Sequence, residues 1–329
     1  MFHYDRGLFL TQAGLAVDVG RGQPLAFVSH AHADHLAPHQ VTYCTPTTGA
    51  LFRLRRGVRR VVRPVEFGEP WEMPARSGGT VRLTALPAGH TLGSAMLLAE
   101  QDGLRLLYSG DCRLGESLTS EPLAVVPADV LVLECTYGRP EYRLPPRDAV
   151  IEQFLDLVRA ALAAERTPVV HGYALGRLQE VAAILHRAGI PTQQEAWVHE
   201  HSQIYRRAGV DLGPARLYDG TPRPGHVLLL PKRAQLRRPL AGLKATTTFI
   251  LSGWAVDPGY ARRERVDHAL PLSDHCDYDE LFTLVEKIGP KVVYCTHGPV
   301  EIVDDFRRAG INAHELATSG CFQPRLLTA

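Results

Sequence analysis

The side chains best suited to chemistry lie in one short stretch, which reads FVSHAHADHLAPH. Within it, four residues form the pattern H-x-H-x-D-H directly after a short apolar run: His30, His32, Asp34 and His35. Neutral imidazole and carboxylate groups suit zinc, iron or manganese. One metal ion does not need so many ligands from one loop, so the stretch predicts two metal ions close together. His39 is left over, and we expect it to lie on the surface.

Three further candidate ligands follow other apolar runs. His90 occurs in PAGHTLGS, Asp111 in YSGDC and His297 in YCTHG. Strand ends are where α/β sheets collect their functional groups. The two oxygens of a carboxylate can bridge two cations, and we expect Asp111 to do so.

The segments that must position these residues are predicted to be strands and helices, as judged from the spacing of their apolar residues. Strands are predicted for the apolar runs GLAVDVG, PLAFVSH, VRLTALPAGH, AMLLAE, LRLLYSGD and VLVLEC. Residues 147–165 and 176–189 have helical periodicity and flank a predicted strand at 168–173. Further strands are predicted for HVLLLPKR, TTTFILSGW and KVVYCTHG, and a helix for DYDELFTLVEKIG. This order is typical of an α/β protein with parallel strands.

The bulk composition excludes some classes of protein. The chain has 329 residues and a net charge of +1, so any polyanion site must be local. The six cysteines include no C-x-x-C pair, which is typical of a reducing compartment. Neither a signal peptide nor a run of about 18 apolar residues occurs, so we expect a cytoplasmic protein that does not bind membranes.

The order of these motifs resembles the metallo-β-lactamase superfamily. H-x-H-x-D-H, then G-H, then G-D, then T-H-G each follow a predicted strand. The resemblance implies a four-layer αβ/βα sandwich with a dinuclear site at one edge of two packed sheets. It also implies that Asp18, in AVDVG, supports the metal loop without binding metal.

Three stretches resemble the signature motifs of the β-CASP nucleases within that superfamily. They are LVLECTYG with Glu134, PLSDHCDYDEL with His275, and YCTHGP with His297. This resemblance implies cleavage of phosphodiester bonds in DNA or RNA. It also implies a β-CASP cap domain with parallel α/β structure at 136–249, inserted into a catalytic domain formed by 1–135 and 250–329.

YALGRLQE, LSGWA and LSDHCDY resemble the bacterial DNA-ligase-associated exonucleases of the DNA damage response, which are related to Artemis-type nucleases. This implies an exonuclease that degrades DNA from 5′ to 3′ in repair, acting on single strands or ends. A DNA ligase and a helicase would be its partners. The alternative is a β-CASP ribonuclease that processes RNA, because a histidine such as His297 in the third motif is typical of RNA-processing members.

These assignments give a mechanistic hypothesis. His30, His32 and His90 would bind one divalent ion, zinc or manganese; Asp34, His35 and His297 would bind the other. A hydroxide activated by the two ions would attack phosphorus, with Asp34 also taking part in catalysis. His275 would protonate the leaving group or hold the phosphate, and Glu134 would orient His275.

Contacts with nucleic acid are predicted from basic and aromatic residues near the motifs. The candidates are Arg177, Tyr137, Trp254, Arg262 and Arg263, although an arginine on a surface helix or an aromatic residue in the core has the same local sequence. Two other functions are considered, a thioester or lactam hydrolase and an inactive nucleic-acid-binding subunit. The long insertion and the β-CASP motifs argue against the first, and the full ligand set argues against the second.

Overall fold

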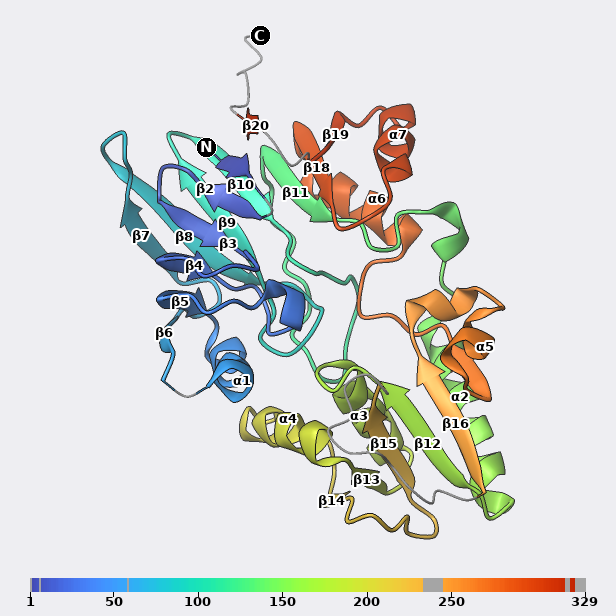
Figure 1. The fold of residues 1–329 in the computed structure, drawn as a ribbon. Coiled ribbons are helices and arrows are strands. Elements are labelled where there is room, and N and C mark those ends of the chain that lie inside the picture. Colours follow the sequence, from blue (N-terminus) through green and yellow to red (C-terminus); the bar gives the residue numbers. More distant parts are fainter. Residues whose placement is uncertain (1, 6, 58, 233–244, 317–319, 323–329) are drawn as a thin grey trace. The chain divides into compact units, whose positions relative to one another are not determined.

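The chain forms two compact units in a computed structural model that describes residues 2–5, 7–57, 59–232, 245–316 and 320–322 (Figure 1). The first unit comprises Met1–Gly115, Glu121–Arg139 and Glu280–Ala329. The second comprises Glu116–Ser120 and Pro140–Asp279. Among the described residues, no helix is long and apolar enough to cross a bilayer.

The first unit contains two seven-stranded sheets. The first sheet has the order β20-β1-β2-β3-β4-β5-β6. Its strands are β20 (Gly320–Phe322), β1 (Phe2–Tyr4), β2 (Leu8–Leu10), β3 (Leu15–Val17), β4 (Leu25–Phe27), β5 (Val41–Cys44) and β6 (Val61–Pro64). From β3 to β6 the strands are parallel, so β3 and β4 end at the same edge.

The second sheet has the order β19-β18-β11-β10-β9-β8-β7. Its strands are β19 (Ala313–Glu315), β18 (Val292–Thr296), β11 (Val130–Glu134), β10 (Leu104–Tyr108), β9 (Ala95–Gln101), β8 (Thr80–Pro87) and β7 (Pro70–Pro74). β9 runs antiparallel to both β8 and β10, whereas β10, β11 and β18 are parallel. The carboxyl ends of β8, β10, β11 and β18 therefore meet at one edge.

One hydrophobic core joins the two sheets. Leu15 and Phe27 of the first sheet share it with Leu83, Leu97 and Val132 of the second, and all five are nearly inaccessible. Helices cover the outer faces: α1 (Pro46–Arg56) lies on the first sheet, and α6 (Tyr278–Ile288) and α7 (Glu301–Arg308) lie on the second (Figure 1). The predicted αβ/βα sandwich is confirmed.

Local sequence explains where these helices begin and which face they bury. The side chain of Thr45 caps α1 by accepting from the Thr48 N–H, and Pro46 occupies the first turn, where its missing N–H costs nothing. In α6, the apolar side chains recur at helical spacing and are buried: Leu281, Leu284, Val285 and Ile288.

The second unit is built on a six-stranded parallel sheet with the order β14-β13-β15-β12-β16-β17. Its strands are β14 (Ala215–Leu217), β13 (Thr192–Gln194), β15 (Val227–Pro231), β12 (Thr167–Gly172), β16 (Thr246–Leu251) and β17 (His268–Leu270). Its helices are α2 (Arg147–Ala163), α3 (Arg177–Arg187), α4 (Ala196–Arg207) and α5 (Tyr260–Glu264). Parallel α/β structure in the inserted segment agrees with the sequence analysis.

The end of the inserted segment differs from the predicted boundary at 249. β16 pairs with β12 in parallel over Thr246–Ile250, and β17 pairs with β16. A strand that hydrogen-bonds to the centre of a sheet belongs to that sheet. The second unit therefore continues to Asp279, and the run TTTFILSGW, placed at the boundary from sequence, lies inside it.

Candidate metal centre

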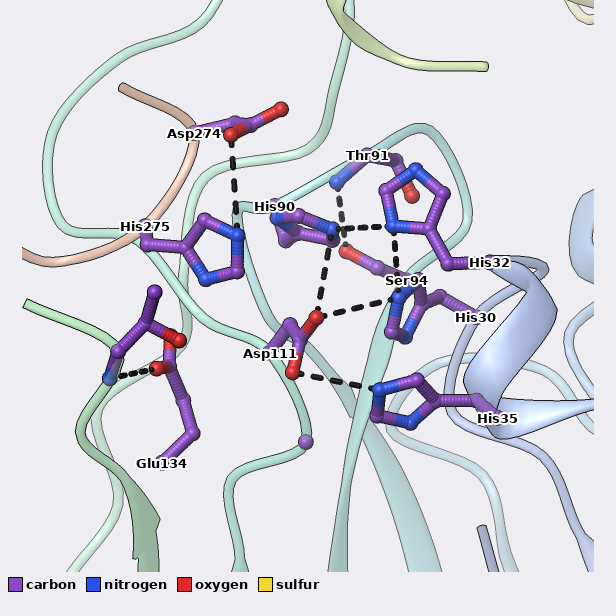
Figure 2. A network of polar contacts seen from close by, with 12 residues as sticks. His30, His32, His35, His90, Thr91, Ser94, Asp111, Glu134, Asp274 and His275 are labelled. Atoms are coloured by element: carbon purple, nitrogen blue, oxygen red, sulfur yellow. Dashed lines mark hydrogen bonds and ion pairs between the residues drawn. The ribbon is translucent and has the colours of Figure 1, made fainter. Parts of the chain in front are cut away.

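The predicted ligands of the first unit all follow strands at one edge of its two sheets. His30, His32, Asp34 and His35 lie directly after β4, and the last two lie within a short 3₁₀ turn at Ala33–His35. His90 follows β8, Asp111 follows β10 and His297 follows β18. These residues follow four different strands. Figure 2 shows that the side chains of His30, His32, His35, His90 and Asp111 lie close together.

Four of these side chains form a compact cluster. The ligand atoms of His30, His32, His90 and Asp111 all lie within 4.8 Å of one another. His32 Nδ1 lies 3.0 Å from both His30 Nε2 and His90 Nε2. Three imidazole nitrogens and one carboxylate that converge in this way have the composition of a zinc or manganese site. The cluster therefore fits the first metal ion that the sequence predicts.

Asp111 faces two groups of ligands with its two oxygens (Figure 2). Asp111 Oδ2 lies 3.4 Å from His30 Nε2 and 3.8 Å from His90 Nε2. Asp111 Oδ1 lies 3.5 Å from His35 Nε2. A carboxylate that bridges two cations needs this arrangement, so the geometry fits the role predicted for Asp111.

The second group of predicted ligands surrounds His35. Asp34 Oδ2 lies 3.7 Å from His35 Nε2, and the rings of His35 and His297 are 5.6 Å apart. Asp34 and His297 are exposed, whereas His35 is buried. Together with Asp111 these residues would offer two imidazoles and two carboxylates to a second divalent ion, which stays a prediction.

Asp18 holds the metal loop from behind. Asp18 Oδ2 accepts hydrogen bonds from Ser29 Oγ at 2.5 Å, His35 Nδ1 at 2.9 Å and Tyr108 Oη at 2.9 Å. Ser29 Oγ also lies 3.0 Å from His30 Nδ1. With Nδ1 engaged in this way, both His30 and His35 direct Nε2 toward Asp111, which is how metal-bound histidines are usually oriented. The supporting position agrees with the role expected for Asp18.

The electrostatics of the cluster favour bound cations. Burial lowers the pKa of His30 well below 6.5, which keeps its imidazole neutral and able to bind metal. Burial would also lower the pKa of His35, but Asp111 and Asp18 outweigh it and raise that pKa to about 10. The carboxylates around His35 therefore stabilise positive charge there, whether from a proton or from a metal ion.

Glycines next to two of the histidines are required by close backbone approaches. Gly89 has φ +79°, and a Cβ on it would lie 2.2 Å from the carbonyl oxygen of Arg113. A Cβ on Gly298 would lie 2.1 Å from the carbonyl oxygen of Cys135. Because Cβ atoms do not approach other atoms so closely, the G-H and H-G pairs fix the loops that carry His90 and His297.

Glu134 is buried at the end of β11 beside this cluster. Its Oε1 accepts from the Cys112 N–H at 3.2 Å, and its Oε2 accepts from the Thr136 N–H at 2.9 Å. Through the Cys112 amide it braces the loop that follows Asp111. The predicted role of Glu134 in orienting His275, which belongs to the second unit, stays a prediction.

The sequence analysis expected His39 to lie on the surface, and this prediction is wrong. It is 1% exposed, and neither ring nitrogen has a hydrogen-bond partner. Burial lowers its pKa to about 4. The residue after Pro38 looked like part of a polar turn, but its ring is buried in the fold.

His275 belongs to the second unit, where a buried ion-pair network lies behind it. Asp274 Oδ1 is 3.8 Å from His275 Nε2 and 2.9 Å from Arg177 Nη2. Arg177 Nη1 also pairs with Glu180 at 2.8 Å, and Arg147 pairs with the other oxygen of Glu180. Sequence reasoning missed Asp274 and Glu180; the acidic letters inside SDH and GRLQE were the available signal.

The predicted nucleic-acid contacts have different outcomes. Arg177 is 2% exposed and committed to the network above, so the prediction that it contacts nucleic acid is corrected. Tyr137, at 3% exposed, packs in the core. Trp254 is 36% exposed against Tyr142, with ring centroids 4.9 Å apart.

Arg262 and Arg263 are exposed on α5, and Arg263 pairs with Asp257 at 2.7 Å. Arg262, Arg263 and Trp254 are therefore accessible to solvent, and their contacts with nucleic acid stay predictions.

Comparison with known proteins agrees with this geometry. Residues 14–171, which contain six of the seven predicted metal ligands, match the model of the β-lactamase superfamily domain. This segment is therefore a domain of the β-lactamase superfamily. The resemblance to this superfamily found in the sequence is confirmed.

Individual relatives carry names connected with nucleic acids. A "Probable DNA ligase" of Opitutus terrae is 34% identical over 94% of this chain and 30% of its own length. The 5′ exonuclease Apollo of Gallus gallus is 34% identical over 47% of this chain and 34% of its own length. An RNase J-like protein of Methanocaldococcus jannaschii is 27% identical over 55% of this chain and 49% of its own length.

The chain thus spans between about a third and a half of the length of these relatives. Among solved structures, a protein of unknown function from Enterococcus faecalis has the same fold, with a TM-score of 0.59 and 15% identity over 83% of this chain and 75% of that one.

Proposed function

We propose that this chain is a metal-dependent nuclease that hydrolyses phosphodiester bonds in DNA, as an exonuclease acting from 5′ to 3′ in repair. Hydrolysis is supported above all by the position of Asp111. Its two oxygens face two groups of histidines at the edge of the sheets where the strands end. When bound there, divalent metal ions would lower the pKa of a water molecule and polarise a phosphoryl oxygen.

The residues of the chain have separate tasks in this proposal. His30, His32 and His90 hold one ion, and His35, Asp34 and His297 hold the other. Asp18 fixes the imidazoles of the buried half of the site by hydrogen bonds, so that the ligands need no rearrangement when metal binds. His275 is the candidate proton donor to the leaving group.

DNA is favoured as substrate by two relatives. The one that aligns with 94% of this chain is named a probable DNA ligase, and another is named a 5′ exonuclease. The first name also supports a repair ligase as a partner, and a helicase is proposed beside it from the sequence resemblance. RNA is the second candidate, because His297 is present in the third motif and one relative is RNase J-like.

The test is a time course on single-stranded DNA and RNA of one sequence, each labelled at the 5′ or the 3′ end. Metal-free protein would be reloaded with zinc or with manganese. Immediate release of a labelled mononucleotide from the 5′ end of DNA is expected. Preferential cleavage of RNA would instead establish the ribonuclease, and release from the 3′ end would reverse the polarity.

Asp111→Asn is the matched loss-of-function variant, because it keeps the size of the side chain and removes the charge that faces both ion positions. Asp102→Asn is its control, since Asp102 is exposed in a turn outside the cluster. We expect the first variant to lose cleavage and the second to keep it. Equal activity of the two would contradict the role of Asp111.

A separate variant tests His275. His275→Ala should keep the metal content of the parent and lower the cleavage rate by about 10²–10⁴-fold, the usual contribution of general acid catalysis. His226→Ala, in the same unit, should leave both unchanged. Loss of metal from His275→Ala would contradict the assignment as proton donor.

A further inference from the structure

The second unit has a pocket of about 330 Å³ that contains none of the predicted metal ligands. Its lining includes His171, Lys232, Ile250, Arg263, Glu264 and Arg265. His171 lies near the carboxyl end of β12, Lys232 directly follows β15, and Ile250 lies near the carboxyl end of β16. The pocket therefore opens at the carboxyl edge of the parallel sheet.

The pocket also lies at a topological switch point. β12 is flanked by β15 on one side and β16 on the other. The chain leaves β12 through α3 toward β13, beyond β15, and leaves β16 through α5 toward β17, in the opposite direction. Loops that leave neighbouring strands in opposite directions open a crevice, and open α/β sheets bind their ligands in such crevices.

Basic residues that are distant in the sequence meet in this pocket. They are Lys232, which follows β15, and Arg263 and Arg265 of the run ARRER. Burial would lower the pKa of Lys232, but Tyr173, Tyr260 and Glu264 outweigh it and the pKa is raised. The ammonium group therefore stays charged at neutral pH.

The balance of charge leaves a preference for an anion. Three cationic side chains line the pocket, whereas one carboxylate, Glu264, lies in the lining and another, Asp257, pairs with Arg263 at 2.7 Å. A guanidinium group binds a phosphate through parallel hydrogen bonds, and an ammonium group adds a point charge.

An aromatic ring lies beside these cations. Tyr173 follows β12 and is 46% exposed, and the Lys232 ammonium lies 4.5 Å from the centre of its ring. Exposed rings beside cationic grooves are the usual platforms on which the bases of single strands stack.

We propose that this pocket binds a backbone phosphate of a single-stranded polynucleotide, with Tyr173 stacking on a neighbouring base. The inference rests on the proposed function only in that the ligand is a nucleic acid. It assigns to the second unit a strand-holding site that none of the catalytic motifs provides.

Binding would be measured on the full metal-loaded chain with a fluorescent single strand of phosphorothioate DNA, which resists cleavage. The pocket variant is Lys232→Gln with Arg265→Gln. The control is Arg159→Gln with Arg207→Gln, which removes the same charge from helices α2 and α4 of the same unit.

We expect the pocket variant to bind about tenfold more weakly and to lower the salt slope of binding by about 0.7 for each lost phosphate contact. The control should bind like the parent. Equal affinities of the two variants would overturn the proposal.

Two further arms identify the ligand. Calorimetry with inorganic phosphate separates a strand from a free anion: phosphate binding that is lost in the pocket variant, with unchanged strand affinity, would show a free-phosphate site and overturn the proposal. Tyr173→Leu should weaken strand binding by about tenfold, whereas Tyr173→Phe should not. Equal binding by both would remove the stacking contact.

This test does not depend on cleavage. A chain that binds the strand through the pocket but cuts neither DNA nor RNA would contradict the nuclease and leave the pocket intact. If the chain cuts DNA, but the parent and the pocket variant bind the strand with equal affinity, the result would contradict only the proposed pocket.

Discussion

Replacing Asp18 with Asn tests whether the buried carboxylate behind the metal loop governs metal affinity. Asp18 has φ +48°, in the left-handed region that Asn and Asp tolerate best among residues with side chains. The substitution therefore keeps the backbone conformation and the shape of the side chain. It removes the negative charge that the Ser29 N–H and the three donors on Oδ2 share, and it replaces one acceptor oxygen with an NH₂ group.

The magnitude follows from those three hydrogen bonds, from Ser29 Oγ, His35 Nδ1 and Tyr108 Oη. A hydrogen bond to a charged group contributes about 1.5–3 kcal/mol and a neutral one about 0.5–1.5 kcal/mol, so the unfolding free energy should fall by about 3 kcal/mol. Metal affinity should fall by about 10–100-fold, because His35 loses its fixed orientation and basicity.

The assay is competition for zinc against a chromogenic chelator, with unfolding by urea measured in parallel. Asp102→Asn is the matched control, since Asp102 also has a left-handed backbone, with φ +52°, and is exposed. Zinc affinities of Asp18→Asn and Asp102→Asn that both equal the parent value would refute the reasoning.

Three other outcomes are expected. Because burial lowers the pKa of His39 from 6.5 to about 4, the unfolded chain takes up a proton at a higher pH than the folded chain, and the parent should lose about 3 kcal/mol between pH 6.5 and 4. His39→Leu should keep this stability in urea titrations across that range, and parallel pH profiles would contradict the burial. Gly298→Ala should lower the unfolding free energy by about 1–3 kcal/mol, because its Cβ would meet the Cys135 carbonyl, and an unchanged melting temperature would argue against that close approach. Arg177→Met should cost about 3–5 kcal/mol in denaturant, because it removes the buried cation that pairs with both Glu180 and Asp274; an unchanged midpoint would show that these pairs are not needed.

The fold and the metal cluster could be predicted from the sequence because both depend on local patterns. The apolar runs that precede His30, Asp111 and His297 form β4, β10 and β18 as expected. Ligands that directly follow such strands are placed by the strand itself. Their convergence required only that the strands end at a common edge.

Other features depend on contacts between distant residues, which no local pattern contains. Helix α1 was not predicted, because it opens with PTTG, whose residues have low helix propensity, although the rest of PTTGALFRLRR consists mostly of good helix formers. Arg177 looked like a surface arginine, and only the fold brings Asp274 to it. The same reason applies to His39, whose burial no local pattern indicates.

The pairing of β11 with β18 has a consequence for how the protein is made. These strands are hydrogen-bonded neighbours, yet the whole second unit is translated between them. Until β18 leaves the ribosome, β11 presents an unpaired edge, which is a template for pairing with other chains. If the inserted unit folds first, it draws the two halves of the interrupted unit together and shortens the loop that must close. A destabilised second unit should therefore reduce soluble yield during synthesis even where the finished first unit is intact.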